Sequence, residues 1–301
     1  MVRDVRRGWA GSYGGWMTAS PLTPLTTPSG TVSIPQLGFG VFQVDDEGVV
    51  APVTAALEAG YRHIDTAKVY GNEAGVGRAL ADSPVAREDV FVTTKLWNAD
   101  QGDHGTARAA LTGSLERLGL EQADLYLIHW PMPSVDRYVQ SWQALRTLRD
   151  EGLTRAIGVC NFDIEHLQRL HDETGEWPAI NQVELHPYLA QAELRAFHEE
   201  HGIVTEAWAP IGQGSGLLDD EVIAQVAAKH GITPAQAVIA WHLAIGNVVI
   251  PKSVTPSRIV ENHASLDVRL DEDDVAAISG LDRGGRIGPV PADFAYDAPG
   301  S

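Results

Sequence analysis

Two hydrophobic patterns alternate along this chain. Short apolar runs, which favour buried strands, are each followed by a longer stretch whose apolar residues recur at helical spacing. The expected strands are Gln36–Gly40, His63–Thr66, Val90–Lys95, Leu125–His129, Ala156–Val159, Ile180–Val183, Val204–Ala207 and Val248–Ile250. The expected helices are Glu47–Glu58, Glu73–Ala81, Gly105–Arg117, Arg137–Asp150, Ile164–His171, Gln191–His201, Pro234–Leu243 and Pro256–Glu261. The pattern therefore predicts eight successive strand–helix units.

Eight such units within about 250 residues favour an α/β fold, the (β/α)8 or TIM barrel. A doubly wound open sheet is the rival, because periodicity alone cannot show that a barrel closes. Two extra helices, Asp219–Lys229 and Glu272–Leu281, fall outside the alternation, and Thr31–Ile34 is expected to form part of a short N-terminal hairpin. We expect one domain over residues 21–301, after a disordered extension over residues 1–20.

The charge balance narrows the function classes. The 301 residues include 22 Lys and Arg against 40 Asp and Glu, which gives a formal net charge of -18. Nucleic-acid binding depends on clustered cations, so this balance argues against it. The one cysteine, Cys160, excludes an intramolecular disulfide and a multi-cysteine zinc site. No apolar run approaches the roughly 18–20 residues of a membrane span. We therefore expect a cytoplasmic protein, monomeric and without a metal site.

Several well-known motifs are absent from the sequence. There is no Gly-x-Gly-x-x-Gly after the first strand, no P-loop and no Gly-x-Ser-x-Gly elbow. The segment His198-Glu199-Glu200-His201 looks like a metalloprotease motif, but its histidines are three residues apart instead of four. A solvated helix end is the better interpretation of that segment.

Polar residues stand where the expected strands end. In a barrel these ends meet at one mouth, which is where catalytic side chains gather. The strand-end residues are Asp65, Lys95, His129, Cys160-Asn161, Gln182, Trp208 and Lys252-Ser253, and Tyr70 lies in the loop five residues after Asp65. Each residue taken singly is more often a surface charge or a structural side chain. Their recurrence at equivalent positions in consecutive units favours a shared site.

These residue types suit one kind of chemistry. A phenol has a pKa near 10, which is high for an acid at neutral pH. A buried cation beside it favours the phenolate, so we expect Lys95 to lower the pKa of Tyr70, with Asp65 holding the ammonium. His129 is placed to hydrogen-bond a carbonyl oxygen. Such a site protonates an oxygen while a hydride donor attacks the carbon.

At this point the sequence resembles the aldo-keto reductase family. The resemblance runs from about Pro35 to Phe294 and rests on six motifs. These are Gly-Tyr-Arg-His-Ile-Asp-Thr-Ala with Tyr-Gly-Asn-Glu (60–73), Thr-Thr-Lys-Leu-Trp-Asn (93–98), Leu-Ile-His-Trp-Pro (127–131), Ile-Gly-Val-Cys-Asn-Phe (157–162), Asn-Gln-Val-Glu-Leu-His-Pro (181–187) and Ile-Pro-Lys-Ser-Val (250–254). It implies a catalytic tetrad of Asp65, Tyr70, Lys95 and His129, with Tyr70 as the general acid in carbonyl reduction.

The resemblance also implies a nicotinamide cofactor bound without a Rossmann loop. Asn161 and Gln182 would hold its carboxamide, Trp208 would stack on the ring, and Ile211 and Gly212 belong to the loop that would meet the pyrophosphate. The adenosine end would be held by Lys252, Ser253, Val254, Arg258, Glu261 and Asn262. Lys252 and Arg258 suit a 2′-phosphate, which favours NADPH over NADH. Cys160 departs from the serine that is usual in the family.

The substrate is less clearly indicated. Phe42, Trp97 and Trp130, together with His129, are candidate walls of a pocket for a small carbonyl compound. The tail resembles that of bacterial reductases related to those acting on 2,5-diketo-D-gluconate, and a short tail predicts an open pocket. Two other functions stay open at this stage. One is a non-catalytic regulatory subunit of the same fold that binds NADPH, and the other is a Schiff-base lyase with Lys95 as nucleophile.

Overall fold

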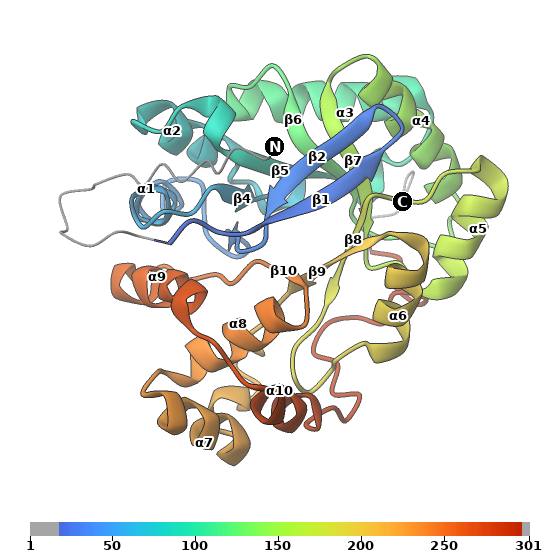
Figure 1. Ribbon diagram of the computed structural model, residues 1–301. Coiled ribbons are helices and arrows are strands. Elements are labelled where there is room, and N and C mark those ends of the chain that lie inside the picture. The colour runs from blue at the N-terminus through green and yellow to red at the C-terminus, as the bar shows by residue number, and fades with distance from the viewer. Residues whose placement is uncertain (1–17, 297–301) are drawn as a thin grey trace, which may run out of the picture.

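The computed structural model describes residues 18–296. Two antiparallel strands, β1 (Leu22–Thr27) and β2 (Gly30–Pro35), precede an eight-stranded parallel sheet in the order β10-β9-β8-β7-β6-β5-β4-β3. The sheet strands are β3 (Phe39–Gly40), β4 (His63–Asp65), β5 (Phe91–Leu96), β6 (Ala123–Ile128), β7 (Thr154–Cys160), β8 (Ile180–Glu184), β9 (Val204–Trp208) and β10 (Val248–Val249). Helices surround this sheet (Figure 1).

The helices follow the expected alternation. They are α1 (Val50–Glu58), α2 (Glu73–Asp82), α3 (His104–Leu118), α4 (Tyr138–Asp150), α5 (Ile164–Thr174), α6 (Ala192–His201), α7 (Glu221–His230), α8 (Pro234–Ala244), α9 (Pro256–His263) and α10 (Glu272–Ser279). The extra helices α7 and α10 are the two predicted outside the alternation. None of the described helices is long and apolar enough to cross a membrane.

The sheet closes into a barrel between its first and last strands. Leu37 forms a parallel bridge with Val249, and the Gly38 amide donates to the Val249 carbonyl at 2.9 Å. The Val249 amide in turn donates to the Gln36 carbonyl at 2.8 Å. Closure excludes the open doubly wound sheet and confirms the predicted (β/α)8 barrel with its N-terminal hairpin. Strand β3 begins at Phe39 instead of Gln36, because Leu37 pairs with Val249 only as an isolated bridge, and β10 ends at Val249, one residue earlier than predicted.

The hairpin fills the end of the barrel where the strands begin. Its side chains Leu25, Val32 and Ile34 are buried in one cluster with Phe91 and Ile180, the first residues of β5 and β8. Figure 1 shows both hairpin strands lying across the barrel. The opposite end, where the strands stop, therefore has to hold the polar side chains that the sequence places there.

The predicted N-terminal extension lies mostly outside the described residues. The predicted disorder of residues 1–20 falls outside the described residues except for residues 18–20, and the domain boundary at residue 21 stays a prediction. Within that short described part, the Ser20 hydroxyl accepts a hydrogen bond from the Leu37 amide at 2.9 Å.

The first barrel helix begins at Val50 and not at Glu47, because the preceding residues form a turn in which Asp45 accepts from the Gly48 amide.

Candidate active site

A buried ion pair lies at the centre of the barrel mouth. Lys95, at the end of β5, places its Nζ 2.7 and 2.9 Å from the two carboxylate oxygens of Asp65, which ends β4. The same Nζ lies 3.0 Å from the Thr66 carbonyl and 3.5 Å from the Tyr70 hydroxyl. Lys95 is 0% exposed and Asp65 is 2% exposed. Neighbouring strand ends and the following loop thus bring together three of the four predicted catalytic residues.

Burial sets the protonation state of this cluster. It raises the pKa of the Tyr70 hydroxyl above its ordinary value, while Lys95 lowers that pKa and Asp65 raises it. The net direction is upward, so the expectation of a lowered tyrosine pKa is wrong for the protein alone. For Lys95, burial lowers the pKa, but the Asp65 carboxylate and neighbouring groups outweigh it and the net direction is upward. Lys95 is therefore a charged ammonium group, and the Tyr70 side chain beside it is a neutral phenol.

His129 completes the predicted tetrad from the neighbouring strand unit. Its ring lies 5.8 Å from the Tyr70 ring and 5.1 Å from the Trp97 ring, both edge-on. Burial, with a smaller contribution from the Lys95 charge, lowers the pKa of His129 well below its ordinary value. The imidazole is thus neutral, and its buried Nδ1 has no hydrogen-bond partner among the described residues. A neutral imidazole beside a phenol is suited to orient a carbonyl oxygen.

Two amide side chains border the ion pair. Asn161 donates through Nδ2 to the His129 carbonyl at 3.0 Å, and its Oδ1 accepts from the Trp208 indole at 2.8 Å. Asn161 has a φ of 64°, a left-handed conformation that is uncommon outside glycine and recurs at functional sites. Gln182 donates to Asp65 at 2.8 Å, and the Cys160 thiol lies 3.6 Å from its Oε1. The residues predicted to meet a carboxamide and an aromatic ring therefore lie together.

A buried carboxyl group that the sequence interpretation missed lies beneath these amides. Glu206 projects inward from β9, is 0% exposed, and accepts from Gln182 Nε2 at 2.9 Å. Its register partner across the sheet is Gln182, so the pairing of β8 with β9 places it beside the site. His63, Asp65 and Glu206 form one cluster within 4.8 Å. We do not treat it as a metal site, because Lys95 already supplies the cation beside Asp65.

Glu206 makes stability depend on pH. Burial and the Asp65 charge raise its pKa from the ordinary value of 4.5 to about 8. The folded chain therefore keeps a proton that the unfolded chain loses, so this group's contribution to stability falls as pH rises through that window. As the pH rises from about 5 to about 8, the melting temperature of the unsubstituted protein should fall relative to that of Glu206→Gln, which cannot titrate at this position. We expect the difference between the two melting temperatures to change by several degrees over this range. A constant difference across that range, measured by circular dichroism, would contradict this.

The residues predicted to hold the rest of the cofactor belong to the segments that follow β9 and β10. The loop after β9 turns sharply at Gly212, where φ is 78° and an added Cβ would lie 2.6 Å from Ser215 Oγ. Ile211 precedes it and is half-buried. The adenosine-end residues lie on the segment after β10 and on α9: Lys252, Val254 and Arg258 are exposed, Ser253 and Glu261 are half-buried, and Asn262 is buried.

Two of these polar groups differ in how they are engaged. Glu261 already accepts a hydrogen bond from the Thr233 hydroxyl at 2.8 Å, so its carboxylate is tied to the start of α8. Arg258 forms no ion pair with any described residue. An exposed, uncommitted guanidinium is available for an anionic ligand.

Aromatic side chains form the walls of the mouth. Phe42, 49% exposed, lies 5.0 Å from the Tyr70 ring. Trp130 packs against Phe294 of the C-terminal tail at 4.1 Å, and Trp97 lies 6.4 Å from the Tyr296 ring. The tail thus places an aromatic ring beside each tryptophan, and the openness of the pocket stays a prediction. Phe294 and Tyr296 are visible in the sequence as tail aromatics, but only the folded structure shows that they lie beside Trp130 and Trp97.

Glu184 fixes the path of that tail. Its fully buried carboxylate accepts the backbone amides of Ile287 at 2.5 Å and Gly288 at 2.8 Å, and it also bonds His186. These hydrogen bonds outweigh burial and lower the pKa of Glu184, so the carboxylate is ionised. An added Cβ on Gly288 would come within 2.5 Å of the Trp208 ring. The tail therefore passes directly against the indole at the mouth.

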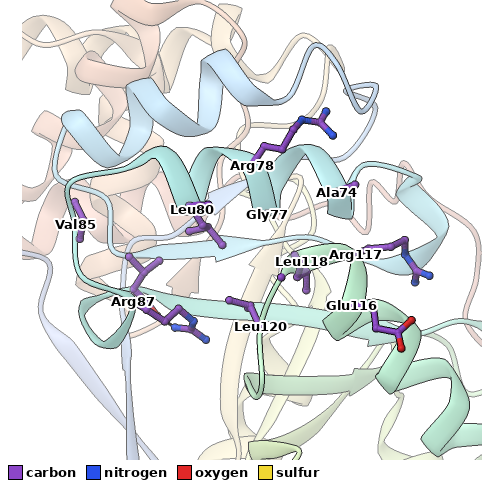
Figure 2. Close-up of a pocket in the computed structure, with 13 residues that line it drawn as sticks. Ala74, Gly77, Arg78, Leu80, Val85, Arg87, Glu116, Arg117, Leu118 and Leu120 are labelled. Carbon is purple, nitrogen blue, oxygen red and sulfur yellow. Dashed lines mark hydrogen bonds between the residues drawn. The ribbon is translucent and has the colours of Figure 1, made fainter.

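A separate hollow of about 460 Å³ lies on the outside of the barrel, between α2 and the end of α3. Its lining includes Leu80, Leu118, Leu120 and three arginines (Figure 2). Arg78 is paired with Asp46, Arg87 with Asp124 and Arg117 with Glu73. Because all three guanidinium groups are already neutralised, the hollow offers little to a charged ligand, and the mouth is the better candidate.

Comparison with known proteins shows which family the chain belongs to. The Aldo/keto reductase family profile matches residues 30–283. The chain is 55% identical over 262 residues to the methylglyoxal reductase DkgA of Salmonella typhimurium, which covers 87% of this chain and 94% of that protein. It is 52% identical over 275 residues to an aldo-keto reductase of Mycolicibacterium smegmatis, which covers 91% of this chain and 99% of that protein.

Solved structures agree with the sequence relatives. A Gox0644 variant crystallised in complex with NADPH has a TM-score of 0.85 and 45% identity, over 91% of this chain and 100% of that one. An aldo/keto reductase from Brucella melitensis has a TM-score of 0.84 and 49% identity, over 89% of this chain and 100% of that one. With a family match across nearly the whole barrel and relatives this similar, the chain belongs to the aldo/keto reductase family of carbonyl-reducing enzymes.

Proposed function

We propose that the protein reduces aldehydes and ketones to alcohols with NADPH, and that Tyr70 is the proton donor. The observation that carries this proposal is the Tyr70 hydroxyl 3.5 Å from the buried Lys95 ammonium, which Asp65 holds in place. A neutral phenol beside a fixed cation has a proton to give and a charge to stabilise the anion that is left.

Each side chain then has a distinct part in the reaction. When bound, the reduced nicotinamide supplies a hydride to the carbonyl carbon. Tyr70 donates its proton to the carbonyl oxygen, and Lys95 stabilises the resulting phenolate. Asp65 keeps Lys95 charged and in position, and the neutral imidazole of His129 orients the oxygen. Asp65, Lys95 and His129 are buried, and a buried setting strengthens these electrostatic contacts.

The cofactor contacts suit NADPH. Asn161 and Gln182 present amides to the carboxamide, the half-buried Trp208 presents a ring face, and the loop at Ile211 and Gly212 presents backbone to the pyrophosphate. Lys252 and Arg258 are assigned to the 2′-phosphate, and the remaining adenosine-end positions are Ser253, Val254, Glu261 and Asn262. Glu261 would share its carboxylate between the cofactor and the Thr233 hydroxyl, which already donates to it.

We expect Arg258→Ala to weaken NADPH binding by about 10-fold or more while NADH binding changes by about twofold or less. The reason is that a charge-assisted hydrogen bond to a phosphate is worth about 1.5–3 kcal/mol. The measurement is quenching of tryptophan fluorescence by each cofactor, with Arg258→Lys as the control that keeps the charge. Equal losses for the two cofactors would show that Arg258 does not read the 2′-phosphate.

For the substrate we propose small aldehydes and dicarbonyl compounds, methylglyoxal and 2,5-diketo-D-gluconate among them. Methylglyoxal is supported by the names of the relatives, which are methylglyoxal reductases called DkgA. The walls formed by Phe42, Trp97 and Trp130, with the tail aromatics above them, support a compact and largely apolar pocket. The test is NADPH oxidation, with NADH in parallel, against methylglyoxal, a nitrobenzaldehyde, a diketone and 2,5-diketo-D-gluconate.

The outcome of that assay separates the two remaining functions within this fold. Turnover with NADPH supports the reductase. NADPH binding without turnover of any of the four compounds would favour a regulatory subunit that binds the cofactor. A monomeric state and a cytoplasmic location stay predictions, and light scattering tests the first of them.

A further inference from the structure

The amide of Gln182 is held by two carboxyl groups. Its Nε2 donates one hydrogen bond to Asp65 Oδ2 at 2.8 Å and one to Glu206 Oε2 at 2.9 Å. Its Oε1 is on the side of Cys160, whose Sγ is 3.6 Å away. The two ends of an amide have nearly the same shape, so the partners alone decide which end faces which way. Here both N–H groups are used, and the oxygen is left on the Cys160 side.

Glu206 has no evident packing reason to be a carboxyl group. It is fully buried on β9, and its side chain makes one hydrogen bond with the described residues, the one from Gln182. Its other oxygen, Oε1, is without a hydrogen-bond partner there and lies 3.7 Å from His63 Nε2. Burying a polar group with so few partners is costly, and an apolar side chain of the same size would avoid that cost.

We propose that Glu206 is a positioning residue, which fixes the amide of Gln182 so that its oxygen is presented to the nicotinamide carboxamide. This inference rests on the proposed function, in which Asn161 and Gln182 hold the carboxamide. Without the acceptor on Glu206, one N–H of Gln182 loses its partner and the amide turns more freely. The oxygen then faces the carboxamide for only part of the time.

Two substitutions separate this role from simple packing. Glu206→Met keeps the length and volume of the side chain but removes the acceptor. Glu206→Gln keeps a carbonyl that accepts from Gln182, and it places its N–H groups toward His63 Nε2. Burial raises the pKa of Glu206 to about 8, so the native group is mainly a neutral acid near pH 7 and glutamine imitates that form.

The experiment measures binding and does not depend on turnover. Each variant is titrated with NADPH and with 2′-phospho-ADP-ribose, which lacks the nicotinamide, and quenching of tryptophan fluorescence is followed. We expect Glu206→Met to bind NADPH about 5- to 10-fold more weakly, as for one lost hydrogen bond. Its affinity for 2′-phospho-ADP-ribose should change by less than about twofold, and Glu206→Gln should bind both ligands like the unsubstituted protein.

Either of two results would overturn the inference. One is unchanged NADPH affinity in Glu206→Met, and the other is an equal loss for both ligands, which would indicate a general structural role. A failed proposed function looks different. If the unsubstituted protein reduces no carbonyl compound but Glu206→Met still loses NADPH affinity selectively, the positioning role stands and the reductase assignment falls.

Discussion

Replacing Tyr70 by phenylalanine is expected to lower kcat for carbonyl reduction by about 10²- to 10⁴-fold, the usual contribution of a positioned general acid. The substitution removes one oxygen, which lies 3.5 Å from Lys95. The ring remains to pack against Phe42, 5.0 Å away. The buried ion pair keeps its other contacts, so the fold and the cofactor contacts should be preserved. Steady-state rates with NADPH and methylglyoxal measure the loss.

NADPH affinity is the control for this variant. Because the phenol acts on the substrate oxygen, the NADPH dissociation constant of Tyr70→Phe, measured by quenching of tryptophan fluorescence, should change by about twofold or less. Unchanged turnover would remove Tyr70 from the role of acid. Reduction of a lysine adduct by borohydride, with Tyr70→Phe still active, would instead revive the lyase hypothesis with Lys95 as nucleophile.

Replacing Lys95 by methionine is expected to damage stability and activity together. It leaves the Asp65 carboxylate, 2% exposed, without its counter-ion and close to the buried Glu206. Removing one partner of a buried pair costs about 3–5 kcal/mol of unfolding free energy. Urea denaturation measures this loss. Activity should fall about as far as in Tyr70→Phe, because no cation remains to stabilise the phenolate.

A double substitution tests the cause. In Asp65→Asn with Lys95→Met neither charge is left, so most of the lost unfolding free energy should return while activity stays low. If the double variant is as unstable as Lys95→Met alone, the loss comes from packing around position 95 and the charge argument fails.

Much of this architecture was predictable because a barrel follows simple periodic rules. Alternating strands and helices predicted all eight units, and the strand-end rule predicted that Asp65, Lys95 and His129 would meet. Those three lie on consecutive strand units, so pairing between neighbouring strands is enough to bring them together. Tyr70 could be added because its loop is short. The resemblance to a family assigned the roles that spacing alone left open.

The properties that could not be predicted from the sequence are those that depend on how each side chain is buried in the folded protein. Tyr70 was expected to have a lowered pKa because Lys95 is its neighbour, yet burial has the larger effect in the folded protein. Glu206 was overlooked because a glutamate in a short apolar run looks like a surface charge, and only the register with Gln182 shows that it points inward. The tail residues Phe294 and Tyr296 reach the site through the fold, which no local pattern encodes.

The hairpin at the far end has a consequence for engineering. Leu25, Val32 and Ile34 seal the barrel floor with the first residues of β5 and β8, while the chemistry lies at the opposite rim. Selection on the two ends can therefore proceed independently. Stabilising changes can be collected on the floor and used to offset the destabilising ones that a new specificity requires at the rim. A library confined to the loops around the mouth would leave this foundation untouched and retain more folded members than one spread over the whole chain.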